Sequence, residues 1–343
     1  MSVGDEIVKI KTVVCLAMAV LFVGSSISQA QSTDKKQESA AERIQRATNK
    51  LNQKQRYKLA YKLKKDEVVR WTVEHTVSTK FQMAGELEES TSRSTTTKVW
   101  KVANVDSLGN MTFVHELEAI NMWQQVGETE PVAYNSKTDK TIPEEYKSVA
   151  ENIGKPLVVF SISPNGKIID RKSNLRQDNF GAGNVTIPLP EEAIPIGHKW
   201  NVPTILQATD DQNQNKKLKA RILYELARVK GDHAYIKFRT EVLTPVTSEK
   251  IKSTIMQQMT KGYLVFDMKR GRQILKQVEW DEKAQGFEGP DSFLKYVGRM
   301  SEKLADSDPS QQNGSSALAP LKTDTATKPV ELKTRDGKPI MRK

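Results

Sequence analysis

The sequence has almost no cysteine. Its single thiol, Cys15, lies close to the amino terminus of a chain of 343 residues. A disulfide needs two thiols, so no disulfide framework can hold this fold together. The fold must therefore depend on its hydrophobic core, and the chain is long enough to bury a large one.

The sequence also lacks the motifs of common enzymes. It has no phosphate-binding loop, no dinucleotide-binding fingerprint and no serine in a nucleophile elbow. The stretch from His115 to Ala119 begins like a zinc-protease motif, but Ala119 stands where the second histidine is required. We therefore expect a non-enzymatic protein with no cofactor, no metal site and no nucleic-acid partner.

Long hydrophobic runs are missing except at the amino terminus. There Lys9 and Lys11 precede an apolar run from Thr12 to Val23, and small residues follow up to Ala30. This pattern is typical of a secretory signal peptide cleaved near Ala30. A retained membrane anchor is the alternative, although a span needs roughly 20 apolar residues. The sequence thus predicts an exported protein, periplasmic or extracellular.

Positive charge is concentrated just after this segment. The net charge is +11, and residues 31–66 alone contain eleven basic and four acidic residues. Apolar residues at Ala40, Ile44, Ala47 and Leu51 recur at helical spacing, which predicts an amphipathic helix. This basic leader is either a solvated helix or a tether to an anionic polymer or membrane surface.

Further along, the apolar residues alternate with polar ones. Tyr57, Leu59, Tyr61 and Leu63 predict a short half-buried strand. The next strand is longer and places six residues on one face: Trp71, Val73, His75, Val77, Thr79 and Phe81. The Ser/Thr-rich run at 90–97 and the two segments that follow continue this pattern as an antiparallel meander.

Two similar hairpins are expected at Lys155–Arg171 and Lys261–Val278. In each, an apolar run ending in phenylalanine leads to a polar turn with glycine and then to a second short strand. Upstream of them, Val99–Val114 aligns with Leu223–Ile236, so that Trp100 matches Tyr224 and Phe113 matches Tyr235, and Trp71 is matched with Trp200. The repeated order predicts a duplication.

The predicted fold is therefore mainly β. Two similar antiparallel units, each a meander with a closing hairpin, form a large curved sheet, a sandwich or an open barrel. A short helix is expected at Pro143–Asn152, and Asp291–Ala305 fits either a helix or a last edge strand. The segments are 1–30 signal peptide, 31–56 basic leader, 57–172 first half, 173–195 linker, 196–305 second half and 306–343 disordered tail.

Several turn and strand motifs resemble one family. They lie at Tyr57–Trp71, Lys98–Phe113, Tyr134–Tyr146, Ile194–Trp200 and Lys261–Arg272. With them the chain resembles a family of uncharacterised secreted bacterial proteins, common in planctomycetes and defined as a domain of unknown function. The resemblance implies an antiparallel β fold and export. It implies no activity and no functional residue.

Four residues stand out as candidate ligand-binding residues: Trp71, His75, Trp100 and His115. Tryptophans can line a sugar or lipid groove, although most are core residues. The two histidines lie on apolar strand faces, and the matched positions of the second half, Thr204 and Lys237, are not histidine. Buried, hydrogen-bonded imidazoles are the ordinary explanation.

These features favour an exported envelope protein with a binding or scaffold role. Its partner would be apolar or polymeric: a lipid, a glycan or an anionic envelope polymer, with peripheral membrane contact as a further option. One alternative is a hydrolase in which His75 or His115 works with Glu116 or Glu118. Another is a structural protein tethered to an anionic surface by its basic leader.

Overall fold

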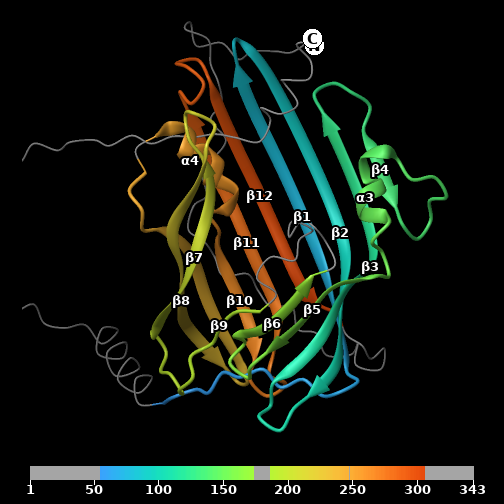
Figure 1. Ribbon diagram of the computed structural model, residues 1–343, viewed down its shortest axis with the longest axis vertical. Helices are drawn as coiled ribbons and strands as arrows, with labels where there is room; N and C mark the ends of the chain where they lie inside the picture. Colours follow the sequence, from blue (N-terminus) through green and yellow to red (C-terminus); the bar gives the residue numbers. More distant parts are fainter. Residues whose placement is uncertain (1–54, 174–185, 247, 306–343) are drawn as a thin grey trace, which may run out of the picture. The chain divides into compact units, whose positions relative to one another are not determined.

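A single antiparallel sheet of 12 strands dominates the computed structural model, which describes residues 55–173, 186–246 and 248–305 (Figure 1). The strand order is β6-β5-β3-β2-β1-β12-β11-β10-β9-β8-β7, and β4 pairs with β3 beside this path. The prediction of a mainly β fold is confirmed, and of the three arrangements that the sequence left open the large curved sheet is the one observed. The predicted signal peptide, leader helix and tail, and most of the linker, lie outside the described residues.

The first half of the chain forms six strands and one short helical segment. The strands are β1 (Val68–Met83), β2 (Glu86–Val105), β3 (Met111–Val126), β4 (Val132–Asn135), β5 (Pro156–Ile162) and β6 (Ile168–Ser173). The helix expected at Pro143–Asn152 is confirmed as η1 (Glu144–Tyr146) followed by α3 (Lys147–Ala150). The hairpin expected at Lys155–Arg171 is β5 and β6.

The second half also runs from three strands through a helical segment to a hairpin, but it has no counterpart of β4 and ends with one further strand. Its elements are β7 (Lys199–Thr209), β8 (Asn215–Lys230), β9 (His233–Val242), α4 (Glu249–Ile255), η2 (Met256–Gln258), β10 (Lys261–Asp267), β11 (Arg272–Gln285) and β12 (Phe293–Leu304). No helix of the described residues is long and apolar enough to cross a membrane.

The duplication is visible in the strand pairing. In the first half β1, β2, β3, β5 and β6 are successive neighbours, and in the second half β7 to β11 follow one another in the same way. The matched hairpins share their irregularities: the ladders slip at Ala103 and at Ala227, and Gly109 and Gly231 both have positive φ. A shared bulge and a shared glycine turn fix the same local twist in both halves.

The match between Trp71 and Trp200 needs a correction. Trp200 lies opposite Tyr224, whereas Trp100, the counterpart of Tyr224, lies opposite Val69. Trp200 is therefore equivalent to Val69, two residues before Trp71. The strand face is unchanged, because side chains two residues apart point to the same side.

The match through Phe113 is also wrong by one residue. Phe113 lies opposite Val102, and its counterpart opposite Leu226 is Ile236 instead of Tyr235. The equivalent of His115 is consequently Phe238 and not Lys237. A slip of one residue exchanges the two faces of a strand, so this difference decides which side chain points inward.

Strand β12 lies in the middle of the sheet. It pairs with β1 on one side and with β11 on the other, and so joins the two halves. The segment Asp291–Ala305 is thus a strand, but the prediction of an edge strand is wrong. The two edges of the sheet are β6 and β7.

The segment Tyr57–Lys64, here called the amino-terminal strap, is extended but belongs to no ladder. Leu59, Tyr61 and Leu63 are buried, as the alternation predicts, yet the backbone makes only isolated bonds. Tyr61 N donates to Pro164 O at 2.7 Å in the β5–β6 turn, and Lys62 N donates to Gly271 O at 2.9 Å in the β10–β11 turn. The strap therefore connects the closing hairpins of both halves at one end of the sheet.

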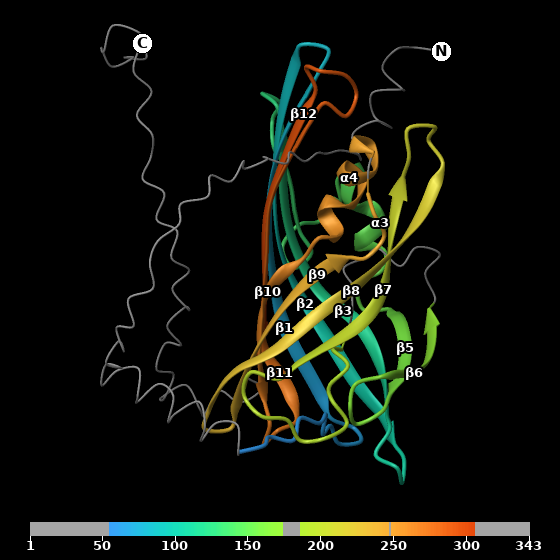
Figure 2. The same cartoon turned by 90° about the vertical axis from the view of Figure 1, so that its left-hand side faces the viewer.

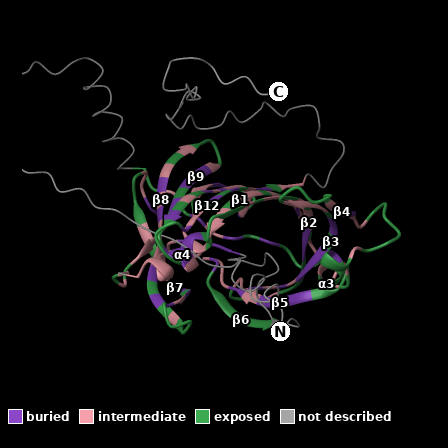
Figure 3. Cartoon of the chain, turned by 90° about the horizontal axis from the view of Figure 1, so that it is seen from above, coloured by how far each residue is buried: buried purple, intermediate pink, exposed green. Residues whose placement is uncertain are grey.

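The sheet is curled along its width, so that its edges face the same side (Figure 3). The inner face carries the largest core cluster, which draws on strands of both halves and on the strap. The segment α4–η2 lies on this inner side, between the long strands β1 and β12 and the edge strand β7 (Figure 2). Ile255 packs there with Leu206 and Leu218 in a smaller cluster.

Candidate functional site

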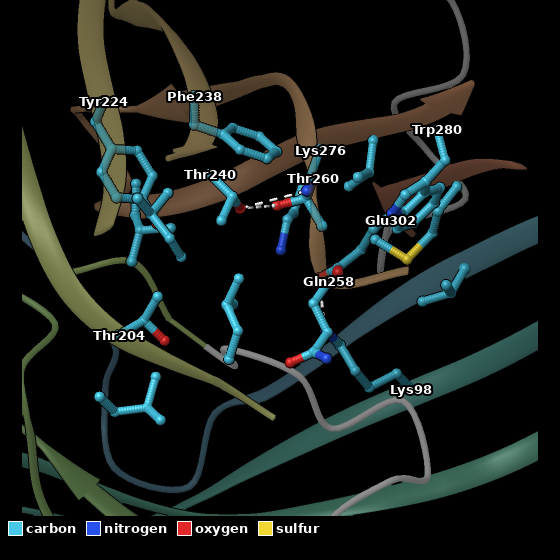
Figure 4. A pocket seen from close by; sticks show the side chains of 17 residues that line it. Lys98, Thr204, Tyr224, Phe238, Thr240, Gln258, Thr260, Lys276, Trp280 and Glu302 are labelled. Atoms are coloured by element: carbon cyan, nitrogen blue, oxygen red, sulfur yellow. Dashed lines mark hydrogen bonds and ion pairs between the residues drawn. The ribbon is translucent and has the colours of Figure 1, made fainter. Parts of the chain in front are cut away.

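A cavity of about 490 Å³ lies on the inner face of the sheet, mostly against strands of the second half. Figure 4 shows the side chains that line it. Its apolar lining comes from β1, β7, β8, β9, β11, β12 and the linker: Val73, Ile187, Ile205, Leu206, Ile222, Tyr224, Phe238, Val278, Trp280 and Met300. Its polar lining is Lys98, Thr204, Thr240, Gln258, Thr260, Lys276 and Glu302. A mostly apolar lining with a few convergent polar groups is typical of small-molecule sites.

Strand alternation brings the charged groups of this cavity inward. Lys98 lies two residues before the buried Trp100, and Lys276 lies two residues before the buried Val278. Glu302 follows the inward-facing Met300 by two residues and is opposite Lys276 in the ladder. Each charge therefore occupies a position that the strand pattern assigns to an apolar residue.

Lys98 and Glu302 form a buried ion pair. Lys98 Nζ and Glu302 Oε1 are 2.5 Å apart, and both side chains are only 10% exposed. Gln273 Nε2 donates a further hydrogen bond to the same carboxylate oxygen at 3.2 Å. Burial alone would raise the pKa of Glu302, but Lys98 and Lys276 outweigh it, so the pKa is lowered and the carboxylate stays ionised.

The ammonium of Lys98 also rests on two aromatic rings. It lies 5.2 Å from the ring centre of Trp71 and 5.5 Å from that of Trp100. The two indoles pack against each other with ring centres 4.4 Å apart. Cation–π attraction is strongest where the cation is desolvated, as it is here.

Lys276 is the second cation of the cavity. Its side chain is half-buried and points into the cavity (Figure 4). Among the described residues it has neither an ion pair nor a hydrogen bond, and the nearest ring, Phe238, is 5.9 Å from its nitrogen. Burial lowers the pKa of Lys276; the charge of Lys98 acts in the same direction, and that of Glu302 opposes it.

The segment α4–η2 closes one side of the cavity. Gln258 Nε2 donates to Gln207 O at 2.6 Å, and Gln207 N donates to Gln258 Oε1 at 2.9 Å. The Gln258 amide thus pairs with the free edge of β7 as a neighbouring strand would. On the opposite side, Trp280 Nε1 donates to Gln257 O at 3.1 Å. Two anchor points, on β7 and β11, hold η2 across the inner face.

The four residues singled out from the sequence lie around this cavity, and none is in its lining. Trp71 and Trp100 are buried in the core next to Lys98. The ring of His75 is 5.7 Å from that of Trp280, which does line the cavity. His115 is buried beside Trp100, and burial together with the charge of Lys98 lowers its pKa to about 4.

The acids of the hydrolase alternative are engaged elsewhere. Glu116 pairs with Lys101 at 2.6 Å, and Glu118 pairs with Arg70 at 3.0 Å. In the described residues His115 Nδ1 and His75 Nε2 have no hydrogen-bond partner. Burial lowers the pKa of His75 as well. Within the part of the chain that the structure describes, Glu116 and Glu118 are thus paired with basic side chains and not with either histidine.

No group of three or more metal-ligating side chains gathers in the described part of the chain. The functional candidates that sequence reasoning missed are Lys98, Lys276 and Glu302. A signal for them was present, because all three lie in phase with the apolar residues of their strands. Their convergence could not be read from the sequence, since Lys98 and Glu302 are about two hundred residues apart in the chain.

No protein-family model and no curated protein matches the sequence. Among solved structures, one of lipovitellin, concerned with lipid–protein interactions, aligns at 8% identity and a TM-score of 0.42; it covers 71% of this chain, which spans 26% of that one. A DUF1329 family protein from Desulfovibrio piger aligns at 11% identity and a TM-score of 0.12, covering 67% of this chain and 83% of its own. At scores this low, neither supports an inference about function.

Proposed function

We propose that this chain is a non-enzymatic binding protein of the cell envelope that holds an apolar or amphipathic ligand in the inner-face cavity. One observation carries the proposal: the core leaves a space of about 490 Å³ whose walls are mainly aliphatic and aromatic. A core that serves stability alone is packed almost without voids larger than a water molecule. The cavity is within the usual range of small-molecule sites, roughly 300–1,000 Å³.

The groups at the cavity favour binding over catalysis. Its carboxylate is tied to Lys98, and the nearby histidines lack an acid partner among the described residues. A general acid–base pair needs two groups within hydrogen-bond reach of a reacting atom. The amides and hydroxyls of the lining can orient a ligand, but they supply no nucleophile with its base.

Native mass spectrometry of the protein purified from its own cells tests the binding role. We expect a bound lipid or another apolar molecule that survives purification. Thr204→Trp, which fills the cavity from β7, should release it. Asn201→Trp places the same bulk on the outer face of that strand and should not. Ligand-free wild-type protein in repeated preparations would contradict the proposal.

Export is the second component of the proposal and has its own test. It is supported by the charged, apolar and small-residue regions that precede Gln31. Fractionation of cells followed by amino-terminal sequencing should find a mature protein that begins near Gln31 outside the cytoplasm. An intact amino terminus in the cytoplasmic fraction would contradict export and leave the binding role to be judged separately.

A further inference from the structure

The charges of the cavity do not cancel. Its lining contains two lysines and one glutamate. Lys98 and Glu302 neutralise each other at 2.5 Å, and Gln273 completes the surroundings of the carboxylate. One positive charge, that of Lys276, remains.

The neighbours of Lys276 do not compensate for it. The hydroxyls of Thr240 and Thr260 are 3.0 Å apart and bond to each other. The Gln258 amide is occupied by the backbone of Gln207. In the described part of the chain no carboxylate other than Glu302 lines the cavity. Glu302 lies opposite Lys276 but is paired with Lys98, so the half-buried ammonium of Lys276 has no carboxylate of its own, and an anion that enters beside it gains charge attraction.

We propose that Lys276 recognises the anionic head of a single-chain amphiphile, a carboxylate or a phosphate, while the tail lies along the apolar wall. This inference rests on the proposed function and specifies its ligand class. The apolar wall formed by Ile222, Phe238 and Val278 adjoins Lys276, so head and tail can be satisfied in one cavity. An ammonium meeting an oxyanion in a desolvated site makes a charge-assisted hydrogen bond, about twice as strong as a neutral one.

Three ligands with one tail and different heads separate the two proposals. Dodecanoate, dodecanol and dodecylammonium are titrated into the full-length protein by calorimetry at neutral pH. The two ions are kept below their critical micelle concentrations, and dodecanol below its solubility limit. We expect dodecanoate to bind about 10- to 100-fold more tightly than dodecanol, as one charge-assisted bond predicts. Dodecylammonium should bind more weakly than dodecanol. Dodecyl phosphate in a fourth titration distinguishes a phosphate head from a carboxylate head.

Lys276→Met tests the residue itself, because methionine keeps most of the length and loses the charge. The variant should bind dodecanol as the wild type does and should lose the preference for dodecanoate. Lys237→Met removes an exposed lysine from the outer face of β9 and should change neither affinity. Circular dichroism establishes that both variants are folded.

Each outcome bears on one proposal. Equal affinity of the wild type for dodecanoate and dodecanol overturns the role of Lys276 and leaves the binding function standing. An equal loss of both ligands in Lys276→Met overturns it too, because the lysine would then only shape the cavity. If none of the ligands binds the wild type, both the ligand class and the role of Lys276 are overturned. The affinities of the three ligands are compared on the wild-type protein, so this test of head charge remains valid even if Lys276→Met does not fold.

Discussion

Neutralising Glu302 should destabilise the protein strongly. The Glu302→Gln variant keeps the size of the side chain but leaves Lys98 and Lys276 close to each other without a counter-charge. Both partners of the ion pair are 10% exposed, so water compensates poorly for the lost carboxylate. Removing one partner of a buried pair costs roughly 3–5 kcal/mol. For a domain of this size the melting temperature should fall by roughly 6–20 °C.

The chain provides a matched control on the same sheet. Lys80 and Glu89 form a Lys–Glu pair between β1 and β2, but their side chains are 46% and 52% exposed. Breaking a pair at the surface costs roughly 0–1 kcal/mol. The Glu89→Gln variant should therefore unfold almost as the wild type does.

Urea denaturation followed by far-ultraviolet circular dichroism measures both costs. Tryptophan fluorescence is less suitable, because Lys98 lies over Trp71 and Trp100. The double variant Lys98→Met/Glu302→Met removes both charges and should be more stable than Glu302→Gln, since an apolar pair often replaces a buried ion pair without loss. Costs of Glu302→Gln and Glu89→Gln within about 1 kcal/mol of each other would refute this reasoning.

Three further predictions concern acid sensitivity, the strap and the sheet edge. The folded pKa of His115 is about 4, below its unfolded value of about 6.5. The free energy of unfolding should therefore fall by about 3 kcal/mol as the pH drops from about 6.5 to 4. Melting curves of His115→Phe should show a smaller fall over this range, and an identical fall would contradict the assignment. Gly271→Ala should destabilise the protein more than Gly231→Ala in urea melts. Both glycines have positive φ, so alanine costs roughly 1–2 kcal/mol of strain at either position. Only at Gly271 would the new Cβ also meet the strap, at 2.5 Å from Lys62. Gln258→Ala should cost about 1 kcal/mol and speed amide exchange at Gln207; unchanged exchange there would show that the edge is protected by other contacts.

Much of the fold could be predicted because its strands have one apolar face. In β1 the alternation from Trp71 to Phe81 matches the inward-facing side chains, and the two closing hairpins were recognisable from their turns. Period-two patterns report which face is buried. They do not report which strand lies next to which.

The errors follow from that limit. The pattern of Phe293–Leu304 fits a strand at an edge as well as one at the centre, and only the pairing with β1 and β11 decides between them. Tyr57–Leu63 alternates like a strand because the strap buries every second side chain, although its backbone bonds go to turns. The alignment of Phe113 is wrong by one residue because it drops two residues from the turn, whereas the turn between Val229 and Ala234 is only one residue shorter than that between Val105 and Met111.

The cavity could not be predicted from the sequence for a related reason. Its charged residues come from β2, β11 and β12, which meet only after the sheet has formed. Tryptophans and histidines are conspicuous in the sequence because they are rare, but none of the four candidate residues lines the cavity. The more informative feature is a charge at an inward strand position, as at Lys98, because such a charge is costly unless something compensates for it.

The central place of β12 has a consequence for the order in which the molecule can assemble. During synthesis every described strand before Phe293 emerges first, yet β1 and β11 each leave a row of backbone groups without a partner until the final strand arrives. The partners in the β1–β12 ladder are 211 to 233 positions apart (Gln82 with Phe293, Trp71 with Leu304), so their pairing closes a very long loop, which makes folding slow. A chain that stops before β12 would form two half-sheets, each with an exposed edge strand at β1 or β11. Such a truncated product should aggregate or be degraded.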